Sequence, residues 1–366
     1  MEILFVHMLN NYTGSPNVLA NFLKEYSQNK TDIHLLTSKT NGFLSGIDKV
    51  KIFDNKYKWT ENRILLTIIF VFSQMYQFFF VLFGKKYDCV YLNTILPFGA
   101  ALAAKLRKIK TVYHVHEYYP NPHLMQKICV YIASRCGDKY IFVSEYLRKC
   151  YEGIFVKNAE IIHNAVSKDF HVNASKKILV ENYLEQKFNG KTIVLPCALK
   201  KYKGVNLLVN IAKKLPEYNF LLVTSNSKEE TNNYFASEKL PSNLLIKNQV
   251  SDMSEIYSNA TLVVNLSIPH GVEGIIETFS MILIEAFEYK TPCIAPCYGG
   301  PLEIIKNEYN GFLLEVENQD EIVNKIKYLF SDFNVYKAFS ENAYLRSKDF
   351  STKKFFNSIY KIIQGE

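Results

Sequence analysis

The stretch that decides the fold is ETFSMILIEAFEYKTPCIAPCYGGPLEII, residues 277–305. Its segment SMILIEAFEY, at 280–289, has the pattern of a helix, and TPCIAPC, at 291–297, is a short apolar run typical of a buried strand. The pair Gly299–Gly300 then precedes Pro301, which stands at a typical first position of another helix. Helices that alternate with buried strands predict βαβ units around a parallel sheet.

The same alternation runs through both halves of the chain. In the first half we predict strands at 3–9, 32–38, 88–94, 111–117, 139–145 and 159–165, with helices at 17–27 and 98–108. In the second half we predict strands at 191–199, 219–225, 260–267, 291–297 and 311–316, with helices at 204–215, 280–289, 319–330 and 350–363. Polar, weakly patterned sequence separates the two halves.

This pattern predicts an α/β protein with two Rossmann-like, doubly wound parallel-sheet domains that face each other across a cleft. A chain of 366 residues is long enough for two domains. We place the N-terminal domain at 1–166 and the C-terminal domain at 167–349. Ligands of such sheets bind outside the carboxyl ends of the strands, so the site residues should follow strands directly.

Composition narrows the function classes. Seven scattered cysteines without a C-x-x-C pair indicate reduced thiols in a cytosolic protein rather than a zinc or redox site. The N-terminus MEILFVHML has no basic segment before its apolar run, so we expect no signal peptide. The net charge of +8 suggests an anionic partner such as a phosphate or an acidic membrane surface. Nucleic acid is disfavoured, because the basic residues are not interleaved with aromatic ones.

One segment, ILLTIIFVFSQMYQFFFVLF at 64–83, is long enough to cross a bilayer. Polar residues interrupt it, and Thr67, Gln74 and Gln77 form a stripe at helical spacing, which favours a helix packed within the domain. A helix that lies in or against a membrane surface is an alternative, and so is a true span. A span would place the neighbouring strands on opposite sides of the membrane, in conflict with the α/β pattern.

Two carboxylates, Glu277 and Glu285, bracket the start of the helix predicted near Phe279. The first turn of a helix offers free backbone N–H groups, here near Thr278, Phe279 and Ser280, and such an end favours phosphate. A carboxylate in the second turn, Glu285, can accept hydrogen bonds from two vicinal hydroxyls, as on a ribose. Both glutamates could equally be ordinary helix-end residues, since acids are common in a first turn.

Several further groups follow predicted strands. KKYKG at 200–204 is a basic turn suited to a diphosphate, although a solvated turn is an equal alternative. Gly299 and Gly300 permit close backbone approach to a ligand. A lone histidine at the end of the strand 111–117 is more often structural, and we discount a metal site there because no further ligand cluster appears. No G-x-G-x-x-G follows the first strand, which disfavours a nicotinamide-dependent oxidoreductase.

At this point the sequence resembles a known family. The block 277–305, with NGFLLE after it, is similar to the donor-binding region of the retaining, nucleotide-sugar-dependent glycosyltransferases of the group 1 type, glycosyltransferase family 4, which have the GT-B fold. The matching residues of that block are Glu277, Glu285, Pro292, Gly299, Gly300 and Glu303. The motifs TGSP, HVHE, VSE, IIHNAV and KG follow the family's order along the whole chain but are less specific.

The resemblance implies a role for each matching residue. In the second half, Glu285 would bind the nucleotide ribose, Glu277 the donor sugar, and Lys203 the diphosphate leaving group. The other implied donor-binding residues there are Phe279, Ser280, Met281, Lys200, Lys201, Gly299 and Gly300.

In the first half, the resemblance implies that His116 lines the active centre. Gly14 and Ser15 would form a loop over the phosphates and the acceptor. The last helix, within 350–366, would cross back onto the N-terminal domain.

The sequence departs from the family in its phosphate-binding details. Ser280 stands where the family usually has glycine, and Cys197 and Ala198 stand near the position of an expected arginine. Lys200 or Lys201 could replace that arginine, although lysine lacks its bidentate fork. The TGSP loop also lacks the common glycine pair.

The resemblance implies a metal-independent hexosyltransferase without a cofactor, which moves a sugar from a nucleoside-diphosphate donor to a hydroxyl of a glycan or lipid-linked acceptor with retention. Bacterial surface polysaccharide biosynthesis is the expected setting, in the cytoplasm or peripherally at the inner face of the cytoplasmic membrane, with residues 64–83 as a contact. The alternatives are a non-catalytic sugar-nucleotide binder of a membrane assembly complex and a GT-B sugar-nucleotide epimerase.

Overall fold

The computed structural model describes residues 1–30, 32–155, 158–250, 252–268 and 276–365. Its contacts divide the chain into two compact units. The N-terminal unit contains Met1–Asn164 and Thr352–Glu366, and the C-terminal unit contains Ala165–Ser351. These limits lie within about two residues of the boundaries expected from the sequence.

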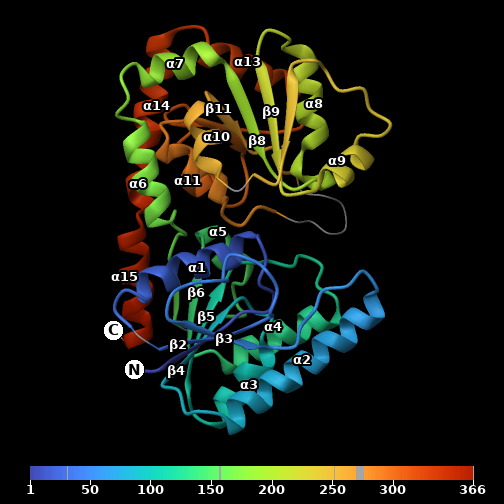
Figure 1. Ribbon diagram of the computed structural model, residues 1–366, viewed down its shortest axis with the longest axis vertical. Helices are drawn as coiled ribbons and strands as arrows, with labels where there is room; N and C mark the ends of the chain where they lie inside the picture. Colours follow the sequence, from blue (N-terminus) through green and yellow to red (C-terminus); the bar gives the residue numbers. More distant parts are fainter. Residues whose placement is uncertain (31, 156–157, 251, 269–275, 366) are drawn as a thin grey trace. The chain divides into compact units, whose positions relative to one another are not determined.

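The N-terminal unit is built on a parallel sheet with the strand order β3-β2-β1-β4-β5-β6-β7 (Figure 1). The strands are β1 Ile3–Val6, β2 Ile33–Thr37, β3 Val50–Asp54, β4 Cys89–Asn93, β5 Lys110–Val115, β6 Lys139–Phe142 and β7 Ala159–Ile161. The central strands are apolar runs buried on both faces, as expected of a parallel sheet covered by helices.

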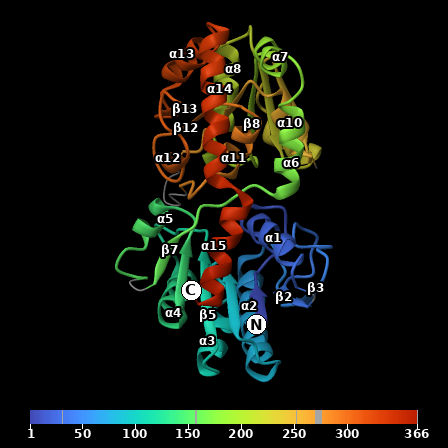
Figure 2. The ribbon, with the colours of Figure 1, turned by 90° about the vertical axis from the view of Figure 1, so that its left-hand side faces the viewer.

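Helices cover both faces of this sheet. They are α1 Gly14–Tyr26, α2 Arg63–Phe83, α3 Phe98–Leu106, α4 Leu124–Cys136, α5 Glu145–Cys150 and α15 Thr352–Gln364. Right-handed crossovers place α1 on one face and the row α2, α3 and α4 on the other. The terminal helix α15 lies beside α1 (Figure 2), where the rings of Phe22 and Phe356 stack 5.2 Å apart. The Lys110 ammonium also donates to the carbonyl of Ile362, 2.6 Å away.

The C-terminal unit repeats the design with the strand order β10-β9-β8-β11-β12-β13. Its strands are β8 Thr192–Pro196, β9 Asn219–Thr224, β10 Leu244–Asn248, β11 Leu262–Val264, β12 Cys293–Pro296 and β13 Gly311–Leu314. Its helices are α6 Lys168–Lys177, α7 Tyr183–Gly190, η1 Lys201–Lys203, α8 Val205–Lys214, α9 Lys228–Tyr234, α10 Met253–Asn259, α11 Met281–Glu288, α12 Pro301–Ile304, α13 Gln319–Leu329, α14 Phe333–Ser347 and η3 Lys348–Phe350. The two Rossmann-like parallel sheets predicted from the sequence are therefore confirmed.

Several elements were missed from the sequence. They are β3, β10, α4, α5, α9, α10 and α14, together with α6 and α7 in the stretch expected to be polar and unpatterned. Both missed strands are edge strands with charged residues on their exposed side, Lys51 in β3 and Lys247 in β10, so neither shows a continuous apolar run. All of the missed helices except α7 have a capping side chain at the N-terminus, and each buries a narrow stripe rather than a broad apolar face.

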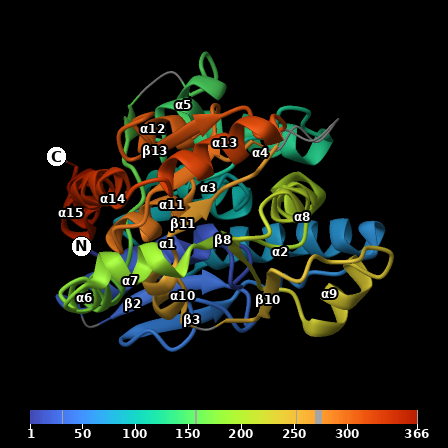
Figure 3. The same ribbon diagram turned by 90° about the horizontal axis from the view of Figure 1, so that it is seen from above.

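Helix α2 packs in an unusual orientation, with its polar residues inward. Ser73, Gln74 and Gln77 are fully buried, and the Gln74 side-chain oxygen accepts a hydrogen bond from the Gly99 amide at 2.9 Å. The strands on either side of α2, β3 and β4, belong to the same sheet, so the helix is a crossover connection and the alternative of a true membrane span is wrong. Figure 3 shows α2 along its length.

A substitution at Gly99 should measure how tightly α2 and α3 are packed. A Cβ atom at Gly99 would overlap the backbone carbonyl of Gln74. We expect Gly99→Ala to lower the free energy of unfolding by about 1–3 kcal/mol, despite the better helix propensity of alanine. Gly14→Ala is the matched control, because a Cβ at Gly14 in α1 meets open space. Equal melting temperatures for the two variants would contradict the close helix contact.

Candidate functional site

In the C-terminal unit a lysine and a glutamate form an ion pair beyond the carboxyl end of β8. Lys203 ends η1, Glu277 precedes α11, and the Lys203 Nζ lies 2.6 Å from the Glu277 Oε2. Both side chains are about three-quarters buried, with exposures of 26% and 22%. Burial works against the ammonium form, but the charge and hydrogen bond of Glu277 outweigh it and raise the pKa of Lys203. The lysine is therefore held as a cation inside a partly dry site.

The second predicted carboxylate, Glu285, lies in the second turn of α11. The Tyr257 hydroxyl on α10 donates a hydrogen bond of 2.7 Å to its Oε2. Burial raises the pKa of Glu285, and the Tyr257 hydrogen bond offsets part of that rise. Tyr257 thereby fixes the direction of the carboxyl group, which retains acceptor capacity for a ligand hydroxyl.

Ser280 shows why a glycine is expected at its position. Its φ of 94° is in the left-handed region, where a side chain costs about 1–2 kcal/mol. Its hydroxyl is buried and accepts a hydrogen bond of 2.9 Å from the side-chain nitrogen of Asn265. This bond offsets part of the backbone cost. We predicted a helix start near Phe279, but the helix begins at Met281. Its free backbone N–H groups therefore start at Met281 and not at residues 278–280.

The glycine pair packs against protein backbone. A Cβ atom at Gly300 would overlap the backbone of Phe279, and one at Gly299 would overlap the Glu277 carbonyl. The Gly300 amide donates to that carbonyl at 2.8 Å. Residues 277–279 therefore fill the side of each glycine on which a Cβ would stand, and the role of the pair in donor binding stays a prediction.

The basic turn at 200–204 divides into two parts. Gly204, with a φ of 71°, lets the turn pack against the backbone of Leu266, just after β11, and so brings Lys203 to Glu277. Lys200 and Lys201 are exposed and lie outside this ion pair.

In the N-terminal unit, His116 and Asn93 meet at the carboxyl ends of β5 and β4. The His116 Nε2 lies 2.9 Å from the Asn93 side-chain oxygen. Burial, together with the nearby His114 and His7, lowers the pKa of His116 well below its ordinary value. A neutral imidazole with one nitrogen fixed by Asn93 can exchange hydrogen bonds with a sugar hydroxyl but carries no charge.

Gly14 and Ser15 form the first turn of α1 rather than the loop that we expected. The Ser15 carbonyl accepts a hydrogen bond of 3.0 Å from the Asn93 side chain. Asn93 therefore connects the start of α1 with His116.

Sequence reasoning missed three residues that organise these groups: Asn93, Asn265 and Tyr257. Asn93 ends β4 and Asn265 follows β11, so each is an asparagine at the carboxyl end of a buried strand, which is a usable signal. Nothing near Tyr257 in the sequence indicates its contact with Glu285, 28 positions away.

A metal site was discounted from the sequence. Among the described residues no group of three or more His, Cys, Asp or Glu side chains could hold a metal ion. Residues 269–275, between β11 and Glu277, lie outside the described part of the chain.

Comparison with known proteins identifies the family. Residues 184–346 match the family model described as glycosyl transferases group 1, and residues 12–170 match the model described as glycosyltransferase family 4. The chain belongs to the group 1 glycosyltransferases. Together the two matches span most of both structural units.

Similar individual proteins support this membership. An uncharacterized glycosyltransferase of Haemophilus influenzae is 25% identical over 247 residues, which are 66% of this chain and 65% of that protein. The capsular polysaccharide biosynthesis glycosyltransferase CapM of Staphylococcus aureus is 26% identical over 234 residues, 60% of this chain and 58% of that protein. Both alignments thus span less than two thirds of the relative's length.

Among solved structures, Anabaena HepE in complex with UDP and glucose superposes with a TM-score of 0.78 at 18% identity, over 100% of both chains. This similarity shows that the group 1 glycosyltransferase described here has the GT-B fold.

The carboxyl of Glu117 should make the stability of this glycosyltransferase depend on pH. Burial raises the pKa of Glu117 from 4.5 to about 7. Its oxygens accept hydrogen bonds from the backbone amides of Ile95 and His116, which offset part of that rise. A raised folded-state pKa gives a stabilisation that is complete below pH 4.5 and is lost as the pH rises through about 7.

We therefore expect the melting temperature of the wild type to fall relative to that of Glu117→Gln as the pH rises from about 5 to 8. Over this range the free energy of unfolding of the wild type should decrease by on the order of 2 kcal/mol relative to that of the variant. Differential scanning calorimetry across this range measures it. A constant difference between the two proteins would show that Glu117 does not change its protonation there.

Proposed function

We propose that this protein transfers a hexose-type sugar from a nucleoside-diphosphate donor to a hydroxyl acceptor with retention of configuration. The observation that carries the proposal is the arrangement around α11, where the Lys203–Glu277 ion pair lies before the helix and the Tyr257–Glu285 pair follows in its second turn. A cation, a helix N-terminus and two carboxylates provide separate contacts for a diphosphate, a sugar and a ribose.

In the proposed reaction the leaving group is a nucleoside diphosphate. Lys203 and the first amides of α11 stabilise its developing negative charge, so the proposal needs no metal ion or cofactor. Glu277 binds hydroxyls of the donor sugar, and Glu285 binds the ribose. In the N-terminal unit the neutral His116 binds a sugar or acceptor hydroxyl.

The bond between the anomeric carbon and the phosphate oxygen breaks through an oxocarbenium-like state. The acceptor hydroxyl attacks from the face that the phosphate leaves, and its proton passes to the departing phosphate. A glycosidic bond thus replaces the phosphate ester, and the configuration at the anomeric carbon is retained.

We propose a glycan or lipid-linked acceptor and a role in bacterial surface polysaccharide biosynthesis. The similarity to CapM, whose name places it in capsular polysaccharide biosynthesis, supports this setting. We also propose a cytoplasmic location, peripheral to the inner face of the membrane. The complex of HepE with UDP and glucose makes UDP-sugars the first donors to test.

The ribose role of Glu285 can be tested by thermal shift with nucleoside diphosphates, UDP first. A ligand that binds only the folded state raises the melting temperature according to its affinity. We expect Glu285→Ala to abolish the stabilisation by UDP, and Tyr257→Phe to reduce UDP affinity roughly 5–10-fold through the loss of one hydrogen bond. Glu315→Ala, an exposed glutamate of the same unit, is the control and should respond like the wild type. If UDP stabilises Glu285→Ala as well as the wild type, the ribose assignment is wrong.

The charge role of Lys203 can be tested by steady-state kinetics with UDP-glucose and a hydroxyl acceptor. We expect Lys203→Ala to lower kcat about 10²–10³-fold, because the lysine acts on charge that develops in the transition state. Lys213→Ala, an exposed lysine on α8, should keep full turnover. NMR of the product reports the anomeric configuration. Release of UDP without any acceptor product, together with an altered sugar, would instead identify an epimerase.

A further inference from the structure

The outer face of α2 is almost wholly apolar. Apart from Arg63, its first residue, the residues of this helix that are more than a third exposed are Ile64, Leu65, Thr67, Ile68, Val71, Phe72, Met75, Phe79 and Phe83. All but Thr67 are hydrophobic, and their spacing follows one side of the helix over five turns. We call these eight hydrophobic residues the apolar face.

The apolar face is large for a protein in water. Two of its central members, Ile68 and Phe72, are 60% and 59% exposed. The eight side chains together expose on the order of 1,000 Å², at roughly 150–250 Å² for a whole large side chain, whereas the largest apolar patch of a typical monomer is ~300–600 Å². A patch of this size indicates a binding surface.

The orientation of the helix is fixed by hydrogen bonds on its other side. Gln74 binds the amide of Gly99 in α3, and the Ser73 hydroxyl donates to the Asn55 carbonyl at 2.7 Å. The side-chain nitrogens of Gln74 and Gln77 both lie 3.2 Å from the Met8 sulfur. Rolling α2 to hide its apolar face would leave these buried polar groups without partners, which is costly.

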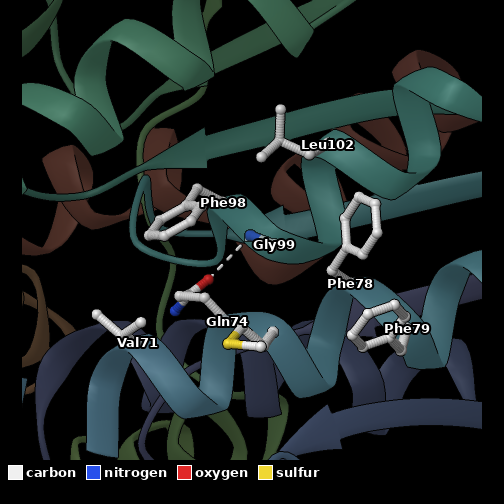
Figure 4. Close-up of a pocket in the computed structure, with 8 residues that line it drawn as sticks. Val71, Gln74, Phe78, Phe79, Phe98, Gly99 and Leu102 are labelled. Atoms are coloured by element: carbon white, nitrogen blue, oxygen red, sulfur yellow. Dashed lines mark hydrogen bonds between the residues drawn. The ribbon is translucent and has the colours of Figure 1, made fainter. Parts of the chain in front are cut away.

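A groove opens on the same face between α2 and α3. It has a volume of about 220 Å³ and is lined by Val71, Gln74, Met75, Phe78, Phe79, Phe98, Gly99 and Leu102. Figure 4 shows rings and aliphatic side chains around it, with Gln74 turned to Gly99. Pockets for complete small molecules usually measure ~300–1,000 Å³, so this groove fits one segment of a hydrocarbon chain better than a whole ligand.

Charge around α2 matches an anionic surface. Residues 56–110 contain nine lysines and arginines against two acidic residues, a difference of +7 in a chain whose net charge is +8. Lys58 and Lys86, which flank the helix, and Arg63, its first residue, are exposed. The bases of this range that are engaged elsewhere in the domain are Lys56 with Asp54, Lys85 with Glu2, Lys105 with Asp138, and Arg107 and Lys110 with backbone carbonyls. The one tryptophan of the chain, Trp59, precedes the helix and is 61% exposed. Basic residues and tryptophan at the ends of an apolar face are typical of helices at a membrane interface.

We propose that the apolar face of α2 docks on the surface of an anionic lipid bilayer and that the groove between α2 and α3 takes one acyl chain of a bilayer lipid. The apolar face would be the surface through which the protein takes the peripheral membrane location proposed above. The assignment to lipid rather than protein follows from the charge and from the face itself. After the first residue of α2, Arg63, the one exposed side chain of the helix able to hydrogen-bond is Thr67, whereas protein interfaces combine apolar residues with a polar, hydrogen-bonding rim.

Vesicle flotation of the full chain tests the docking without any need for turnover, so its outcome is independent of the proposed reaction. We expect binding to phosphatidylcholine vesicles that contain about one third phosphatidylglycerol, and at least tenfold weaker binding to pure phosphatidylcholine or at high salt. The double variant Ile68→Gln/Phe72→Gln should bind at least tenfold more weakly. Leu345→Gln is the matched control, because Leu345 is 62% exposed in the C-terminal unit and should leave binding unchanged.

Fluorescence tests the contact with lipid chains. We expect the emission of Trp59 to shift to shorter wavelength on vesicle binding. In Trp59→Phe/Phe79→Trp the tryptophan lies at the groove, and lipids with brominated acyl chains should quench it.

Three results would overturn the proposal. One is equal flotation of the wild type and the double variant. Another is no binding to either vesicle type. The third is a concentration-dependent dimer of the wild type, absent in the double variant, by analytical ultracentrifugation, which would assign the apolar face to a second copy of the chain.

Discussion

The contact between the glycine pair and the backbone of residues 277–279 determines the geometry of the C-terminal site. Gly300 donates a hydrogen bond to the Glu277 carbonyl, and neither Gly299 nor Gly300 has space for a side chain. With that backbone held, the Glu277 side chain reaches Lys203 and the chain turns through the left-handed Ser280 into α11. The position of Glu285 follows from where that helix begins. Both carboxylates thus depend on a contact that contains no functional side chain.

The ion pair explains how a site for an anion can contain a carboxylate beside its cation. A lysine buried without a partner tends to lose its proton, because burial disfavours the charged form. Glu277 reverses this tendency and raises the pKa of Lys203, so the ammonium is present before any donor arrives. An ammonium has three donors, and a bound diphosphate could share it with the glutamate. In the proposed reaction Glu277 therefore keeps the lysine charged in addition to binding the sugar.

Sequence reasoning found the residues that are close in the chain or lie at the ends of strongly apolar strands. The spacing of Glu277 and Glu285 around one helix start is local information, and so is the turn that ends at Gly204. The partners of these residues were missed because folding alone brings them together, as with Tyr257 and Glu285. A sequence also cannot show whether the atoms that approach a glycine belong to a ligand or to the protein, and the packing of Gly299 and Gly300 against residues 277–279 could not be predicted. The edge strands β3 and β10 were missed because their exposed charges interrupt the apolar pattern.

Helix α2 shows how a correct pattern can leave the environment undecided. In the sequence, the stripe of Thr67, Gln74 and Gln77 favours a packed helix over a helix at a membrane, but the structure leaves Thr67 exposed, so only the two glutamines belong to the packed side. In the structure the two glutamines are buried and the helix is packed, yet its opposite face is hydrophobic and exposed. A helix in water needs the reverse arrangement, because buried amides must each find a partner and exposed hydrocarbon gains nothing from water. The hydrogen bonds of Gln74 with Gly99 and of Ser73 with Asn55 set the orientation of α2. Apolar side chains at these two positions would make no directional contact and would not fix that orientation. The inverted helix satisfies the packing of the fold and also exposes a surface suited to a nonaqueous neighbour. Packing against the domain and the proposed contact with a membrane would therefore use opposite faces of one helix rather than exclude each other.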